Sequence, residues 1–153
     1  MGKNKLFNSN GSTLVLSIKP IYAEKIFGGS KTVELRKTRP KRIAAGDIVL
    51  VYISSPIKSL AGAFRIDEVI EESLMDLWKK VKNRAGISYT EFSEYYNGSS
   101  IGVGLMFNEF WKIKNPIPLE IIKERCINFV PPQSFKYASN SEINLATEGL
   151  RLN

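Results

Sequence analysis

The chain has 153 residues, of which 43% are hydrophobic and 24% charged, so it is long enough to form one globular domain with a buried core. Its 22 lysines and arginines exceed its 15 aspartates and glutamates, which gives a formal net charge of +7. Histidine is absent and Cys126 is the only cysteine. The composition therefore excludes Ser-His-Asp and Cys-His catalytic triads, zinc sites built from Cys and His, and an intramolecular disulfide.

The first third of the chain predicts a strand, a short helix and a second strand. Residues 13–18 are mostly apolar and indicate a buried strand. Pro20 suits the first position of a helix, and Gly28-Gly29 can end that helix in a left-handed conformation. Residues 32–36 then alternate as a strand does, and residues 38–46 are typical of a loop.

The middle of the chain predicts two longer strands followed by a helix. Residues 48–53 are continuously apolar, as in a strand that is covered on both faces, and residues 54–56 (Ser-Ser-Pro) end it. Residues 60–70 resume as a long strand, in which Gly62 indicates a bulge. Ser73 can cap a helix whose apolar residues follow the i, i+3, i+4, i+7 spacing.

The last third predicts two short helices on either side of one more strand. Ser88-x-x-Glu91 has the capping-box pattern of a helix that residues 97–98 (Asn-Gly) would end. Residues 101–113 are strand-like, and Pro118 can start another short helix. The sequence from residue 139 onward is polar, and we expect it to be loose.

Together these elements predict an α+β domain of five or six strands interrupted by short helical insertions. Mostly antiparallel strands with irregular helices between them indicate a small, partly open β-barrel. We expect residues 1–12 to form a flexible N-terminal arm, residues 13–137 the folded domain and residues 138–153 a C-terminal tail.

The positive charge is concentrated at the start of the chain. Residues 1–42 hold 10 basic and 2 acidic side chains, whereas residues 43–153 hold 12 basic and 13 acidic ones. A basic run is often only a solvated loop, but closely spaced cations favour an anionic partner such as phosphate. The run is densest at Arg36, Lys37, Arg39, Lys41 and Arg42. An acidic cluster, which we expect to open a helix, comprises Asp67, Glu68, Glu71, Glu72 and Asp76.

The segment Gly29-x-Lys31-x-x-Glu34-x-Arg36 gathers three charged side chains around one strand. On a regular strand Glu34 and Arg36 share a face, and their neighbours point toward the core. Lys31 has the wrong parity for that face, but the glycines before it allow the backbone to re-aim it. The three groups form either a polar pocket or a surface ion pair worth less than ~1 kcal/mol.

Several stretches of this sequence resemble the ASCH domain, a PUA-like family named after a human transcriptional coactivator. The Gly-x-Lys-x-x-Glu-x-Arg segment is the signature of that family, and the resemblance covers roughly residues 13–137. The matching stretches are residues 16–23, 29–36, 46–47, 52–56, 62 and 131–135.

The resemblance implies a PUA-like β-barrel with a cleft beside a short helix, lined by Lys31, Glu34 and Arg36. Tyr52 and Ser54 are expected as further cleft members, although Tyr52 equally fits a core aromatic whose hydroxyl is satisfied at the edge. The residues that we expect to contact nucleic acid are Lys19, Lys31, Glu34, Arg36, Lys37, Arg39, Lys41, Arg42, Tyr52, Ser54 and Lys58.

The main functional hypothesis is a module that binds RNA or a nucleotide, with a part in the regulation of transcription or translation. Single-stranded or looped RNA is favoured, because splayed bases can enter a cleft. The sequence has no apolar run long enough for a membrane span and no apolar segment of signal-peptide type at its start, so a cytoplasmic location is expected. No cofactor is predicted.

Three other functions belong to different classes. A single-strand ribonuclease would use Lys31 and Glu34 as its catalytic residues, or a divalent metal ion. A protein-interaction adaptor in transcription would dock through the acidic cluster. The N4-acetylcytidine amidohydrolases that the family also implies use a threonine where this chain has Glu34, and their distant glutamate falls near Ala85. The sequence therefore argues against the amidohydrolase.

Overall fold

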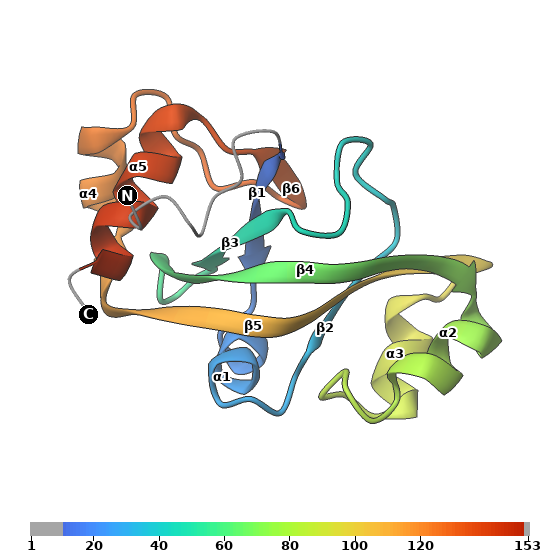
Figure 1. Cartoon of the computed structure of the whole chain (residues 1–153). Coiled ribbons are helices and arrows are strands. Elements are labelled where there is room, and N and C mark those ends of the chain that lie inside the picture. Colours follow the sequence, from blue (N-terminus) through green and yellow to red (C-terminus); the bar gives the residue numbers. More distant parts are fainter. Residues whose placement is uncertain (1–10, 152–153) are drawn as a thin grey trace.

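The computed structural model describes residues 11–151, and within them the chain forms six strands and five helices (Figure 1). The strands are β1 (Thr13–Ile18), β2 (Val33–Arg36), β3 (Ile48–Ile53), β4 (Ser59–Ser73), β5 (Ile101–Pro118) and β6 (Phe135–Tyr137). The helices are α1 (Pro20–Phe27), α2 (Leu74–Val81), α3 (Tyr89–Tyr95), α4 (Leu119–Arg125) and α5 (Asn140–Arg151).

The six strands form one curled sheet in the order β2-β5-β4-β3-β1-β6. β1 is parallel to β3, and the other neighbouring pairs are antiparallel. The prediction of an α+β fold with five or six mostly antiparallel strands is therefore confirmed. β2, which carries the Lys-Glu-Arg signature, lies at one end of the sheet, and β6 lies at the other.

The two longest strands bend where their pairing shifts. The register of β4 against β5 changes at Leu60/Gly62 and again near Ile66, which fits the bulge predicted at Gly62. A methyl group on Gly62 would lie 2.3 Å from the Trp111 carbonyl oxygen and 2.7 Å from the Phe27 ring. The glycine therefore allows α1 and β5 to approach this bend closely.

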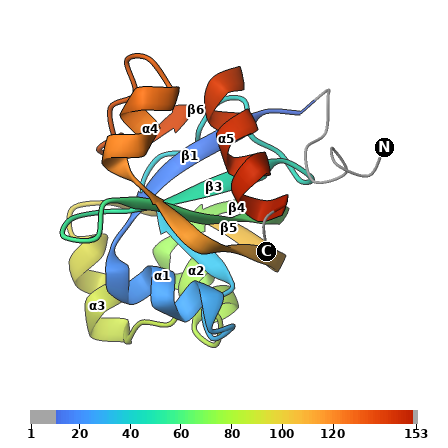
Figure 2. The ribbon, with the colours of Figure 1, turned by 90° about the vertical axis from the view of Figure 1, so that its left-hand side faces the viewer.

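Helices cover both faces of the sheet. Figure 2 shows α4 and α5 on one side and α1, α2 and α3 on the other. Alternate residues of β3 divide between the two faces: Val49 and Val51 belong to one buried cluster, and Leu50 and Tyr52 to the other. A third cluster, which includes Leu77 and Phe92, joins α2 and α3 to β2 and the ends of β4 and β5. α3 is therefore fixed beside β2 by a small core of its own.

The C-terminal segment differs from its prediction. Residues 140–151 form α5 rather than a loose tail, and Leu145 and Ala146 are buried against the sheet. Ser139 and Glu142 exchange capping-box hydrogen bonds at the start of this helix. The capping pattern is visible in the sequence, but the polar composition around it conceals the narrow apolar stripe. Of the expected N-terminal arm, residues 1–10 lie outside the described residues.

The acidic cluster also differs from its prediction. Four of its residues lie on β4, which continues to Ser73, and only Asp76 lies in the first turn of α2. The strand is longer than predicted because its outer half pairs with β5 along the whole length from Glu68 to Ser73. Among the described residues, no helix combines the length and the apolar character needed to cross a membrane.

Candidate functional site

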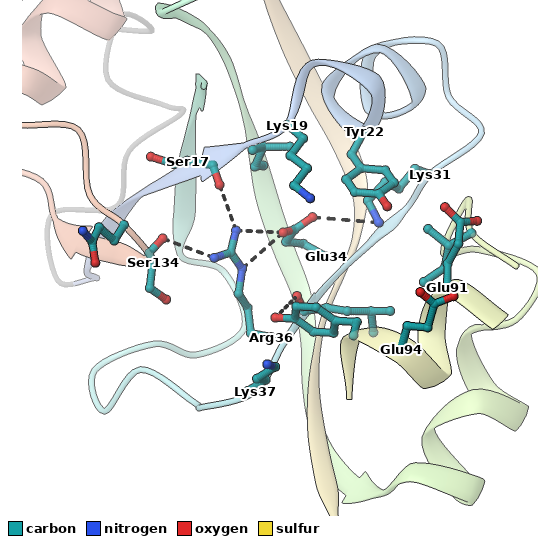
Figure 3. A pocket seen from close by; sticks show the side chains of 15 residues that line it. Ser17, Lys19, Tyr22, Lys31, Glu34, Arg36, Lys37, Glu91, Glu94 and Ser134 are labelled. Carbon is teal, nitrogen blue, oxygen red and sulfur yellow. Dashed lines mark hydrogen bonds and ion pairs between the residues drawn. The ribbon is translucent and has the colours of Figure 1, made fainter. Parts of the chain in front are cut away.

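A cleft of about 650 Å³ lies at the seam where the two ends of the curled sheet approach each other (Figure 3). Its walls come from the junction of β1 and α1, from β2, from α3, and from residues 133–134, which precede β6. These segments are far apart in the sequence, and the curl of the sheet brings them together.

The signature segment supplies the floor of the cleft. Val33 and Leu35 are buried in the core that holds α2 and α3. Glu34 and Arg36 alternate with them and line the cleft, as predicted from strand parity. Gly29, with a φ of 89°, makes the turn after α1 that re-aims Lys31 toward Glu34. The sequence therefore predicted the meeting of these three charged groups.

Lys31 is buried, with only 3% of its surface exposed. Its ammonium nitrogen Nζ donates a hydrogen bond to the Ala85 carbonyl oxygen at 2.8 Å and lies 3.9 Å from Glu34 Oε1. It also lies 5.2 Å from the centre of the Tyr22 ring. Burial lowers the pKa of Lys31, against the opposite influence of the Glu34 carboxylate. The ammonium is therefore a stronger acid than that of an exposed lysine.

Arg36 holds Glu34 in place. Its Nε and Nη2 donate to Glu34 Oε2 at 3.1 and 2.8 Å. Nη1 also donates to the Ser134 carbonyl oxygen and Nη2 to that of Ser17, each at 3.2 Å. The guanidinium thus joins β2 to the opposite end of the sheet. With its donors engaged in this way, Arg36 fixes the position of the Glu34 carboxylate.

Two exposed cations stand at the rim of the cleft. Lys19 precedes α1 and Lys37 follows β2, and both line the opening. The Lys37 ammonium lies 5.0 Å from the centre of the Tyr95 ring. Within the part of the chain that the structure describes, neither ammonium has a carboxylate partner. Besides Lys31 and Arg36, these two lysines are the predicted nucleic-acid-binding cations that line the cleft.

α3 forms a wall that sequence reasoning missed. Glu91, Glu94 and Tyr95 line the cleft from this helix, and Tyr22 lines it from α1. Burial, followed by the charge of Glu91, raises the pKa of the Tyr22 hydroxyl. The capping box assigned Glu91 to helix stability alone. Strand parity cannot show that a helix more than 50 residues further on faces β2.

Three residues predicted near the cleft lie elsewhere. Tyr52 is 2% exposed and packs against Phe129 on the other face of the sheet, with the ring centres 5.9 Å apart. The prediction that it belongs to the cleft is wrong, because its parity on β3 places it in the core beneath α4 and α5. Ser54 does not line the cleft, and its Oγ donates to the Ile18 carbonyl oxygen at 3.4 Å. Lys58 is exposed beyond the end of β3.

The loop after β2 carries three further predicted cations beside the cleft rather than in it. Arg39, Lys41 and Arg42 are exposed and do not line the cleft. The Arg42 guanidinium stacks 3.9 Å from the centre of the Tyr137 ring, and its backbone N–H donates to the Tyr137 hydroxyl. The loop is therefore held against β6, at the same seam of the sheet.

The described residues contain no group of three or more His, Cys, Asp or Glu side chains placed to hold a metal ion. The cleft instead offers charged and hydroxyl groups: an ammonium beside a carboxylate on its floor, two ammonium groups at its rim, and two carboxylates on α3. Such a site can bind a polar ligand that carries both an anionic group and hydrogen-bond donors.

Comparison with known proteins places this architecture in one family. The sequence matches the ASCH domain over residues 16–126. A protein of Zymomonas mobilis named an ASCH domain-containing ribonuclease is 29% identical over 128 residues, which cover 84% of this chain and 85% of the relative.

Solved structures agree with this match. The ASCH crystal structure from Zymomonas mobilis superposes with a TM-score of 0.81 at 28% identity, covering 87% of this chain and 92% of that one. The N-terminal domain of McrB from Staphylothermus marinus shares the fold alone, with a TM-score of 0.61 at 14% identity over 94% of both chains. On the evidence of its signature, its fold and these matches, the chain belongs to the ASCH domain family.

Proposed function

We propose that this protein binds single-stranded RNA across the cleft. The observation that carries the proposal is the pair of rim ammonium groups, Lys19 and Lys37, which have no carboxylate partner among the described residues and flank a floor of buried charge. Phosphate is the anion that best complements such cations in a nucleic acid. The exposed cations of the loop after β2 continue the positive surface along the seam. A relative named a ribonuclease supports RNA as the ligand.

The floor offers the contacts that a base requires. Lys31 Nζ is a hydrogen-bond donor and Glu34 Oε1 an acceptor, 3.9 Å apart, while Glu34 Oε2 is already bound by Arg36. One donor beside one acceptor is the pattern that complements the Watson–Crick edge of an unpaired base. In a duplex that edge is covered, so a single strand is the form that fits.

A salt titration tests the proposal. Each neutralised phosphate contributes about −0.7 to the slope of log K against log salt for a single strand, so three engaged cations give a slope near −2. We expect a fluorescein-labelled RNA decamer to show this slope by anisotropy. We expect the double variant Lys19→Ala/Lys37→Ala to bind more weakly and with a slope that is shallower by about 1.4.

The matched control is Lys79→Ala/Lys123→Ala, which removes two exposed cations that do not line the cleft. It should leave the slope of the natural protein almost unchanged. If the two double variants behaved alike, net charge rather than the rim of the cleft would govern binding. A flat salt response of the natural protein would overturn the proposal itself.

Cleavage of the bound RNA by transesterification is the second candidate, favoured by the ribonuclease name of the Zymomonas relative and by the contact between Lys31 and Glu34. Glu34 would accept the proton of a 2′-hydroxyl as its oxygen attacks the adjacent phosphorus. Lys31 would donate a proton to the 5′-oxygen as the phosphorus–oxygen bond breaks. The products would be a 2′,3′-cyclic phosphate and a 5′-hydroxyl.

Cleavage is tested with end-labelled single-stranded RNA, incubated with EDTA or with Mg²⁺. The mechanism predicts cleavage in EDTA, loss of cleavage with a 2′-deoxy substrate, and loss of cleavage in Lys31→Met at RNA concentrations that saturate this more weakly binding variant. Cleavage that required Mg²⁺ or survived in Lys31→Met would remove these two residues from the catalytic role. Crosslinking in cells would then identify the RNA bound, and with it any role in transcription or translation.

A further inference from the structure

We infer that the α3 wall selects RNA bases that carry an exocyclic amino group, so that cytosine binds in preference to uracil, with Glu94 as the specificity-determining residue. This inference rests on the proposed binding of RNA in the cleft and adds to it which base enters and in which orientation.

Opposite charges line the cleft. Glu91 and Glu94 project from α3, whereas Lys19 stands at the start of α1 and Lys37, which follows β2, lies beside the Tyr95 ring (Figure 3). A ligand that satisfies both sets of charges is anionic at one end and rich in N–H donors at the other. A nucleotide meets this requirement when its phosphate faces the lysines and its base faces α3, because the reverse orientation would place phosphate against two carboxylates.

The two glutamates of the wall are not equivalent. Glu91 Oε1 accepts a hydrogen bond from the Ser88 backbone N–H at 2.9 Å, so this carboxylate is engaged in the cap of its own helix. Within the described part of the chain, the Glu94 side chain has no ion-pair or hydrogen-bond partner, and it is exposed. Glu94 is therefore the acceptor that is available to a ligand.

A carboxylate distinguishes an amino group from a carbonyl group. It accepts a hydrogen bond from the amino group of cytosine, whereas it repels the carbonyl oxygen that uracil has in the same place. The two bases are otherwise almost identical in shape. Discrimination between them therefore reports on polar contacts and not on the size of the cleft, and a change at Glu94 separates its own contact from those of the floor.

The inference is tested with fluorescein-labelled hexamers of cytidine and of uridine at neutral pH. Both carry the same number of phosphates, so the contacts of Lys19 and Lys37 cancel in the ratio of their dissociation constants. We expect the cytidine hexamer to bind at least about fivefold more tightly. Glu94→Gln should reduce this ratio to about twofold or less, mainly by strengthening the uridine hexamer, because an amide can donate as well as accept.

Glu124→Gln is the matched control, because it makes the same change in charge at an exposed position of α4, away from the cleft. It should keep the ratio of the natural protein. Equal binding of the two hexamers to the natural protein, or an unchanged ratio in Glu94→Gln, would overturn the inference and leave the proposed function standing. If neither hexamer bound, both this inference and the proposed binding of RNA would be overturned.

Discussion

Replacing Glu34 with glutamine is expected to lower the free energy of unfolding by about 3–5 kcal/mol. The Glu34 carboxylate is the partner of two cations, Arg36 at 2.8 Å and Lys31 at 3.9 Å, and all three side chains are largely or partly buried. A glutamine has nearly the same shape but no charge, so it leaves two cations close together in a poorly hydrated site. Urea unfolding, monitored by circular dichroism, measures the difference.

Lys31→Met is the contrasting variant. It removes one of the two cations, and Glu34 keeps its bond to Arg36. The Ala85 carbonyl loses its donor, at a cost of about 1–3 kcal/mol, but the ammonium no longer has to be desolvated, which offsets that cost. We therefore expect Lys31→Met to be clearly less destabilising than Glu34→Gln. The opposite order would show that the carboxylate is not the centre of this network.

Phe92→Ala is expected to cost about 3–5 kcal/mol of stability and to weaken RNA binding by the cleft. Phe92 is 2% exposed, and its ring packs 4.9 Å from Trp78 and 4.8 Å from Tyr96, measured between ring centres. This contact is the centre of the small core that holds α2 and α3 beside β2. Without the Phe92 side chain, α3 is no longer packed against β2, and the cleft loses the wall that carries Glu94.

Ser93→Ala, at the adjacent exposed position of α3, provides the control and should change stability by less than about 0.5 kcal/mol. Binding is compared at a urea-free condition in which circular dichroism shows that both variants are folded. If Phe92→Ala remained folded and bound RNA as tightly as the natural protein, the α3 wall would have no part in binding.

Local patterns were sufficient for most of the fold. β1 and β3 begin and end where their apolar runs do, α1 begins at Pro20, and the capping box of α3 forms between Ser88 and Glu91. In each case the deciding interactions lie within a few residues of the element. The gathering of Lys31, Glu34 and Arg36 was predictable for the same reason, because a strand and one glycine turn determine it.

The remainder depended on contacts between distant segments. Tyr52 was assigned to the wrong face, since a continuously apolar strand does not reveal which residues face the cleft. The engagement of Arg36 depends on the Ser17 and Ser134 carbonyl groups, which the curl of the sheet supplies. β6 has three residues, too few for a recognisable alternation. To predict that α3 lines the cleft, one would have to know the third core cluster, in which this helix packs against strands that precede and follow it in the sequence.

The position of β1 in the sheet has a consequence for synthesis on the ribosome. β1 comes first in the chain, yet it lies between β3 and β6, and β6 ends only at Tyr137. The edge of β1 that faces β6 must therefore stay unpaired until residues 135–137 have been translated. A chain that stalls or terminates before residue 135 would expose that edge to other chains, and we expect it to aggregate rather than persist as a smaller folded unit.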